Sequence, residues 1–375
     1  MDARPLWISA GELSGDMHGA ELLAALSAKD ASLSFIGMGG PHMAQKAPFT
    51  PLFHIDELSV MGATEVLQHL PRILDLLSRI KKAMAETRPR ALIVIDAPSF
   101  HFRVIKAARE LGIPVYYYIS PKAWAWNQNR ALFIKENVRR LISILPFEVS
   151  FYKKFGMDID YVGNPLVDMV DWEHIKDIPP VSGKIGLLPG SREREITSLA
   201  PEFGKAASIL RQKLPHLSFH MVRAPGVSEE KLRALWPGDV PLTVQPPDNR
   251  YAFMRSCEML IAASGTVTLE AALTRTPTLV TYKVSPITYF LARTVVKIPY
   301  ISLSNLILDK ALFPELLQRD ADGETIAAKA LEWLAAPDGS RPLDAVRNEL
   351  GVLQAQMGEP GAVHRAADVI LKDLP

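Results

Sequence analysis

The sequence is poor in cysteine and has no long apolar run. Cys257 is the single cysteine among 375 residues, which excludes a disulfide framework and a cysteine-based metal site and fits a reducing compartment such as the cytoplasm. No apolar run reaches the roughly 18 residues that a transmembrane helix needs. Residues 1–10 also lack the basic start and apolar stretch of a signal peptide. We therefore expect a soluble or peripheral protein.

An excess of charge of one sign is absent as well. The chain has 42 Lys and Arg against 41 Asp and Glu, so its formal net charge is +1. No overall field attracts a polyanionic partner such as nucleic acid. At 375 residues the chain is too long for one ordinary core, and two domains of typical size are expected.

Short apolar runs that end in turn residues and lead into amphipathic stretches recur along the whole chain. This rhythm is typical of βαβ units and predicts an α/β fold with two Rossmann-like domains, whose parallel sheets would face each other across a cleft. A proline-containing connection at 161–180 marks the hinge, which gives domains at 1–165 and 166–345 and a helical tail at 346–375. The expected strands are 6–10, 34–38, 91–96, 115–119 and 141–145, and then 185–188, 218–222, 242–244, 259–262 and 278–282.

One turn in the second domain has the features of a phosphate-binding loop. A buried strand ends before Gly190, Ser191 and Arg192, and a helix starts directly after them. Gly190 allows the backbone to approach a ligand closely, the helix N-terminus offers N–H groups, and Arg192 adds a charged donor. An ordinary turn with a surface arginine is an equal interpretation of this segment alone.

A second loop of the same domain repeats the pattern. Ser264, Gly265 and Thr266 follow a strand and open a helix, and Glu270 lies one turn further on. A carboxylate there suits the two vicinal hydroxyls of a ribose, although a first-turn acid can also serve only the helix dipole. Because both loops lie at the carboxyl ends of strands in one open sheet, together they predict a nucleotide site.

The first domain opens with another strand, glycine-containing loop and helix. Its glycines at 11, 15 and 19 do not form the G-x-G-x-x-G fingerprint, so no NAD or FAD cofactor is expected. Contact with a substrate and a structural role such as helix capping are equal alternatives for this loop. The candidate contact residues are Glu12, Ser14, Gly15 and Asp16.

Two further segments of the first domain end at the same edge of its sheet. Asp96 follows the strand at 91–95 and is the candidate general base, with His101 as a second candidate and a turn role as the alternative. An aromatic segment after the next strand contains Lys122 and Trp124. These side chains suit a sugar or phosphate group, and they equally suit a core with a solvated basic turn.

An apolar stripe at helical spacing, with basic residues nearby, runs from 62 to 82. Pro71 lies inside the stripe, so we expect a kink or a break there. Such a stripe either lies in a lipid interface or faces a core, and the pattern alone favours the core. The residues that would contact a membrane are Val66, Leu67, Leu70, Ile73, Leu74 and Leu77.

Taken in order, these segments resemble the lipid-A-disaccharide synthase family, bacterial enzymes that join two acylated glucosamine units. The matching motifs are GELSGDMHG at 11–19, GMGGPHM at 37–43, SVMGATEV at 59–66, DAPSF at 96–100, YYISPKAWAW at 117–126, LPFE at 145–148, LLPGSREREI at 187–196, ASGTVTLEAAL at 263–273 and IPYISLSNLIL at 298–308.

The resemblance implies a GT-B glycosyltransferase that uses no metal and no other cofactor. Its donor would be UDP-2,3-diacylglucosamine and its acceptor 2,3-diacylglucosamine 1-phosphate, joined with inversion into a β-1,6-linked disaccharide phosphate as UDP leaves. By motif, Asp96 matches the base and Asn305 a further cleft residue. The donor-side residues matched by motif are Ser191, Arg192, Ser264–Thr266 and Glu270.

Acylated substrates imply peripheral contact with the cytoplasmic face of the inner membrane. They shift the interpretation of the stripe at 62–82 slightly towards a lipid interface. No nucleic-acid partner is implied, and a homodimer stays open.

The sequence departs from the family pattern at a few positions around the expected cleft. Ser99, His101, Asn164 and Ser304 stand where aspartate, asparagine, histidine and proline are usual, whereas Asp96 is retained. The alternatives are another UDP-sugar enzyme, such as a 2-epimerase or an undecaprenyl-linked N-acetylglucosaminyltransferase, and a relative that binds a sugar nucleotide without turnover.

Overall fold

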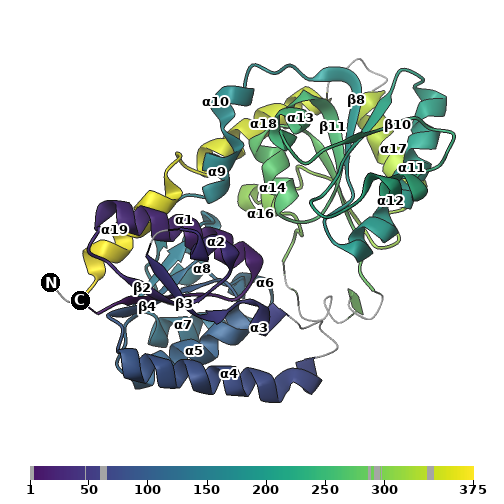
Figure 1. Ribbon diagram of the computed structural model, residues 1–375. Coiled ribbons are helices and arrows are strands. Elements are labelled where there is room, and N and C mark those ends of the chain that lie inside the picture. Colours follow the sequence, from purple (N-terminus) through teal and green to yellow (C-terminus); the bar gives the residue numbers. More distant parts are fainter. Residues whose placement is uncertain are drawn as a thin grey trace. The chain divides into compact units, whose positions relative to one another are not determined.

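The computed structural model describes residues 4–46, 48–59, 66–285, 289–290, 296, 298–335 and 342–375. The chain forms two compact units (Figure 1). The first contains Met1–Pro165 and Glu359–Pro375, and the second contains Leu166–Gly358. The expected tail at 346–375 is therefore divided, since its first part belongs to the second unit and its last helix to the first.

The first unit is built on a seven-stranded parallel sheet of order β3-β2-β1-β4-β5-β6-β7. Its strands are β1 (Leu6–Ala10), β2 (Phe35–Gly39), β3 (Phe49–His54), β4 (Ala91–Ile95), β5 (Val115–Tyr118), β6 (Arg140–Ser143) and β7 (Asp160–Tyr161). The central strands β1 and β4 are buried along their whole length, because helices cover both faces of the sheet (Figure 1).

The helices of the first unit connect these strands. They are α1 (Leu13–Lys29), α2 (Pro41–Ala44), α3 (Asp56–Ser59), α4 (Val66–Thr87), α5 (Pro98–Glu110), α6 (Ala123–Trp126), α7 (Arg130–Asn137), α8 (Phe147–Lys153) and α19 (Ala362–Asp373). α4 runs through Pro71 without the break that the sequence suggested.

α19 brings the end of the chain back into the first unit, where it lies beside α1 (Figure 1). Its apolar face, which includes the fully buried Ile370, joins the core of this unit. The carboxylate of Asp373 accepts hydrogen bonds from the Tyr116 hydroxyl at 3.0 Å and from Arg139 Nε at 2.5 Å. The last helix is thus held by both apolar and polar contacts.

The second unit contains a six-stranded parallel sheet of order β10-β9-β8-β11-β12-β13. Its strands are β8 (Val181–Leu188), β9 (Ser218–Val222), β10 (Leu242–Gln245), β11 (Cys257–Ala263), β12 (Thr278–Tyr282) and β13 (Glu315–Leu317). Its helices are α9 (Pro165–Val170), α10 (Trp172–Ile175), α11 (Glu193–Lys213), α12 (Glu229–Ala234), α13 (Arg250–Ser256), α14 (Thr266–Leu273), α16 (Leu303–Leu308), α17 (Gly323–Leu334) and α18 (Pro342–Gln356).

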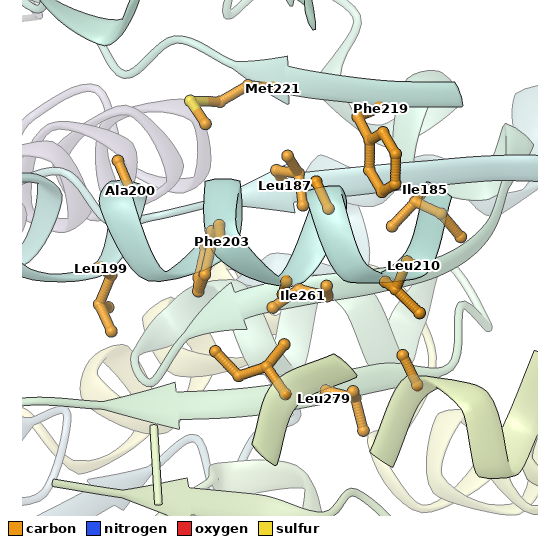
Figure 2. Close-up of a cluster of buried hydrophobic side chains, with 14 of the residues drawn as sticks. Ile185, Leu187, Leu199, Ala200, Phe203, Leu210, Phe219, Met221, Ile261 and Leu279 are labelled. Atoms are coloured by element: carbon orange, nitrogen blue, oxygen red, sulfur yellow. The ribbon is translucent and has the colours of Figure 1, made fainter. Parts of the chain in front are cut away.

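The core of the second unit shows why α11 forms. Its apolar residues recur at helical spacing, and Leu199, Phe203 and Leu210 lie against strand residues such as Leu187 and Ile261 (Figure 2). The two sheets, with helices between parallel strands, confirm the predicted α/β class with two Rossmann-like units.

Each sheet has one point where the strand order reverses, and crevices that bind ligands occur at such points. In the first unit β1 and β4 lie side by side there, with Ala10 opposite Ile95. In the second unit β8 and β11 do so, with Leu188 opposite Ala262. The loops that follow these four strands are the loops that the sequence singled out.

We predict that α19 is required for the stability of the first unit. Ile370→Ala removes a fully buried side chain from its core and should lower the free energy of unfolding by about 2–5 kcal/mol. Lys372→Ala, on the exposed side of the same helix, is the matched control. Urea unfolding followed by far-UV circular dichroism measures both, and equal stabilities would contradict the packing of α19.

Candidate functional site

The chain turns sharply after β4. Asp96 and Ala97 both have positive φ, 48° and 44°, which residues other than glycine seldom adopt. The carbonyl oxygen of Asp96 accepts hydrogen bonds from the Tyr117 hydroxyl at 2.9 Å and from His101 Nδ1 at 2.7 Å. A Cβ on Gly11 would lie 2.4 Å from the Ala97 Cβ, so glycine is required there for the loops after β1 and β4 to meet.

The carboxyl group of Asp96 is half-buried at this turn. Burial raises its pKa above the usual range, and the nearby charges of Lys122 and His18 oppose that rise. Burial also lowers the pKa of His18, against the attraction of Asp96. A carboxyl group whose pKa is raised by burial, with the charge of Lys122 acting on it, suits a general base.

His18 is a residue that the sequence analysis missed. It lies four residues after Ser14, on the same face of α1, so helical spacing from a residue already singled out was an available signal. The side chains of Glu12 and Ser14 are exposed on this first turn of α1, and Lys122 is exposed after β5. These residues and Asp96 follow the carboxyl ends of β1, β4 and β5.

His101 stabilises the turn at Asp96 and Ala97. It is fully buried, its Nδ1 bonds the Asp96 carbonyl, and its Nε2 lies 3.0 Å from the Ser9 hydroxyl. Burial lowers its pKa to about 4, so the ring is neutral near pH 7. Since both ring nitrogens are engaged within the protein, the structure gives His101 a supporting role in place of the second base considered from the sequence.

Asp16 is also fully buried, and its carboxylate caps a different helix from its own. It accepts hydrogen bonds from the backbone N–H groups of Gly40, His42 and Met43 at 2.6, 2.9 and 3.2 Å, at the start of α2. Gly15 is buried beside it, where a Cβ would lie 3.5 Å from the Ile95 carbonyl oxygen. Asp16 thus has the structural role that the sequence left as an equal alternative to substrate contact, and Gly15 packs closely against the end of β4.

Two further candidates have polar groups engaged inside the fold. The buried Trp124 donates from Nε1 to Glu148 Oε1 at 2.9 Å. Asn305 is fully buried, where its side chain donates to Phe313 and Glu315 and accepts from the Phe313 N–H. These hydrogen bonds connect α16 to the segment that leads into β13. The buried Asn305 side chain therefore has a structural role in place of the substrate contact expected from the sequence.

In the second unit, the loop after β8 has a charged partner of its own. Gly190 has φ 115°, and a Cβ there would lie 2.5 Å from Glu195 Oε2. That oxygen accepts hydrogen bonds from the N–H groups of Ser191 and Arg192 at 3.1 and 3.3 Å, and the Arg192 guanidinium bonds Oε1 at 2.9 Å. Glu195 thus occupies the donors that the sequence assigned to a phosphate.

The loop after β11 has a more open helix start. Ser264 donates its N–H to Thr281, Gly265 precedes α14 without a side-chain cap, and Thr266 is exposed. Apart from its two chain neighbours, no residue that the structure describes would come within 4 Å of a Cβ on Gly265. An uncapped helix N-terminus with room in front of it favours an anionic group.

Glu270, one turn into α14, is buried next to Arg250 and Tyr251 of α13. Arg250 Nη2 lies 3.0 Å from Glu270 Oε1 and donates to the Tyr251 hydroxyl at 2.7 Å. Burial raises the pKa of Glu270, and Arg250 opposes that rise. Neither partner could be predicted from the sequence, because no residue spacing relates α13 to α14.

The apolar stripe of α4 is divided in the structure. Leu76 and Ile80 are buried, Ile73 and Leu77 are partly buried, and Leu74 is 53% exposed. The side chains of Val66, Leu67 and Leu70 lie outside the described residues. Among the helices that the structure describes, none has the length and apolar content to cross a membrane. In the same part of the chain, no three His, Cys, Asp or Glu side chains gather in a way that could hold a metal ion.

We predict that Asp16 acts through stability and not through ligand contact. Asp16→Ala leaves three backbone N–H groups without their acceptor and should lower the free energy of unfolding by about 2 kcal/mol. Glu12→Ala, at the exposed end of the same helix, is the control and should leave stability within about 0.5 kcal/mol. Denaturant unfolding measures both; an unchanged Asp16→Ala midpoint would refute the capping role.

Comparison with known proteins places this chain in a family. The sequence profile of the lipid-A-disaccharide synthetase family matches residues 6–350. A lipid-A-disaccharide synthase of Myxococcus xanthus is 37% identical over 98% of this chain and 97% of its own length. One of Trichlorobacter lovleyi is 38% identical over 97% of this chain and 96% of its own.

Solved structures share the fold at low sequence identity. MurG of Acinetobacter baumannii has a TM-score of 0.63 and 17% identity, over 98% of each chain. UDP-GlcNAc 2-epimerase of Neisseria meningitidis, bound to UDP-GlcNAc, has a TM-score of 0.63 and 13% identity, over 98% of this chain and 99% of its own. The fold is thus the GT-B fold, and with the match over nearly its whole length this chain belongs to the lipid-A-disaccharide synthase family of glycosyltransferases.

Proposed function

We propose that this protein transfers the 2,3-diacylglucosamine unit of UDP-2,3-diacylglucosamine to 2,3-diacylglucosamine 1-phosphate (lipid X). The products are a β-1,6-linked lipid A disaccharide 1-phosphate and UDP. The observation that carries the proposal is the position of Asp96, a carboxylate of raised pKa at the strand-order reversal of the first sheet, in a chain of this family. A carboxylate of this kind suits deprotonation of an acceptor hydroxyl.

The second unit binds the donor in this proposal. The open N-terminus of α14, with Ser264, Gly265 and Thr266, receives the diphosphate, and Glu270 accepts hydrogen bonds from the ribose. Arg250 engages Glu270 Oε1 and orients the carboxylate, whose oxygens have further lone pairs for a hydroxyl. The side chain of the exposed Arg192 bonds Glu195 through Nη1, so its other N–H groups can meet the leaving diphosphate.

The first unit supplies the base. Asp96 accepts the proton of the acceptor 6-hydroxyl, whose oxygen attacks the anomeric carbon as the bond to the diphosphate breaks and UDP leaves. One such in-line displacement inverts the α-linked donor to a β product. Because Asp96 must be ionised, turnover should rise with pH through its raised pKa.

Acylated substrates need a surface that meets the bilayer, and we assign this to α4. Leu74 is exposed, Lys81 and Lys82 are exposed two turns further on, and Arg72 is exposed elsewhere on the same helix. Apolar and basic side chains on one helix suit the headgroup region of an anionic membrane. The proposed location is therefore peripheral, on the cytoplasmic face of the inner membrane.

The direct test is to incubate the purified protein with both acylated glucosamine substrates, with UDP release and mass spectrometry of the lipid product as readouts. The proposal expects one UDP for each disaccharide phosphate formed. UDP-sugar binding without any disaccharide would overturn it and favour a binding protein. Conversion of UDP-N-acetylglucosamine to its 2-epimer would identify an epimerase.

We predict that Asp96, in the first unit, contributes to turnover and not to UDP binding. Asp96→Asn should keep the affinity for UDP and lose turnover by at least ~100-fold, because general-base catalysis contributes about that much. Asp158→Asn, exposed elsewhere in the first unit, is the control and should keep turnover. Steady-state kinetics and calorimetric UDP titration measure both variants, and full turnover by Asp96→Asn would exclude Asp96 as the base.

Arg192→Ala should instead weaken UDP binding, because it removes the charged donor next to the diphosphate. Arg194→Ala provides the matched control, since Arg194 is exposed two residues further along the same helix. We expect the dissociation constant of UDP to rise about tenfold in Arg192→Ala, as loss of one charge-assisted hydrogen bond predicts. Equal affinities in the two variants would remove Arg192 from the donor site.

A further inference from the structure

A buried carboxyl group in the first unit has no part in the chemistry described so far. Glu148, on α8, is 1% exposed. Its Oε1 accepts the hydrogen bond from Trp124 Nε1 at 2.9 Å, and its Oε2 accepts a short hydrogen bond from the Ser143 hydroxyl. Glu148 therefore joins three segments, α6, the end of β6 and α8.

The same network reaches the start of the turn that precedes α6. The Ser120 hydroxyl lies 2.9 Å from the Tyr152 hydroxyl, both side chains are buried, and Ser120 also bonds the Glu148 carboxyl. The Trp124 ring packs edge-on against Phe147 at 5.0 Å between centroids. The turn from Ser120 to Trp124 is thus anchored at both ends by α8.

This turn begins at a strained residue. Ile119 has φ 64°, a conformation that β-branched residues rarely adopt, and such a residue persists only where its surroundings hold it. Lys122 lies between the two anchors, is exposed, and its charge acts on both the Asp96 and the Glu148 carboxyl groups.

Burial of a carboxyl group is costly, and an apolar side chain of similar size would avoid that cost. Burial raises the pKa of Glu148 to about 7, against the hydrogen bonds from Ser143, Trp124 and Ser120. An apolar residue, however, could not accept the hydrogen bonds from Ser143, Trp124 and Ser120. The geometry of the turn is therefore the feature that Glu148 preserves.

We propose that Glu148 is a positioning residue for the transfer reaction, which holds the turn from Ser120 to Trp124 and through it places Lys122 beside Asp96. The proposal rests on the proposed function, because it assigns Asp96 the base. Glu148 touches neither the reacting atoms nor the donor. Its effect reaches the reaction through the charge of Lys122, which favours the ionised form of the Asp96 carboxyl group.

The test compares the Asp96 pKa in wild type, Glu148→Ala and Lys122→Met, by carbon-13 NMR titration of the labelled full chain. The other titratable groups around Asp96 are His18 on α1, His101 on α5 and Tyr117 on β5, and all stay in place. We expect Glu148→Ala and Lys122→Met to raise the Asp96 pKa by the same amount, and the double variant to raise it no further.

Conservative variants separate positioning from folding. Glu148→Gln keeps an acceptor for Trp124 and an amide that can bond Ser143, so it should restore the wild-type pKa of Asp96. Trp124→Phe removes the hydrogen bond to Glu148 but keeps an aromatic ring. If the Glu148→Ala variant does not fold, Trp124→Phe is titrated in its place. Glu136→Ala, an exposed glutamate on α7, is the control.

Turnover provides the second readout. The acid limb of the pH–rate profile should move to higher pH in Glu148→Ala, with UDP affinity unchanged and kcat reduced about tenfold at neutral pH. An Asp96 pKa that stays at its wild-type value in Glu148→Ala overturns the positioning role. If the wild-type protein forms no disaccharide, the proposed function is overturned instead. The NMR titration then still shows whether Glu148 affects the Asp96 pKa.

Discussion

The left-handed turn at Asp96 and Ala97 is the constraint on which the candidate site of the first unit depends. Two consecutive residues with positive φ cost roughly 1–3 kcal/mol each, and the surrounding structure has to offset that cost. Hydrogen bonds from Tyr117 and His101 to the Asp96 carbonyl do so, and Gly11 leaves room for the turn. The position of the Asp96 side chain therefore depends on the conformation of this turn.

Carboxylate side chains have different roles in the two units. In the first, buried polar residues such as Asp16 and Glu148 hold loops, and the charge of the exposed Lys122 acts on the half-buried Asp96. In the second, Glu195 satisfies the start of α11, whereas the start of α14 has no side-chain cap. An anionic ligand therefore gains more from the start of α14, whereas the sequence alone favoured the loop at Gly190–Arg192 for phosphates and Glu270 for a ribose.

Much of this arrangement could be predicted from the sequence, because central strands are continuous apolar runs and their loops carry glycine, hydroxyl and acidic residues. The edge strands β3, β7 and β13 escaped prediction, since short, partly exposed strands lack such runs. The strands expected to end at Asp96 and Ile119 stop one residue earlier, where φ becomes positive. Pairs such as Glu148 with Trp124 and Glu270 with Arg250 could not be predicted either, because no spacing rule relates residues on different helices.

The most direct test of the account is the turnover of Gly11→Ala. The added methyl group would lie 2.4 Å from the Ala97 Cβ and would push the turn, and with it Asp96, out of position. The account predicts a folded protein that binds UDP with wild-type affinity and has lost most of its disaccharide formation. Wild-type turnover by Gly11→Ala would show that catalysis does not depend on this turn and would contradict the central claim.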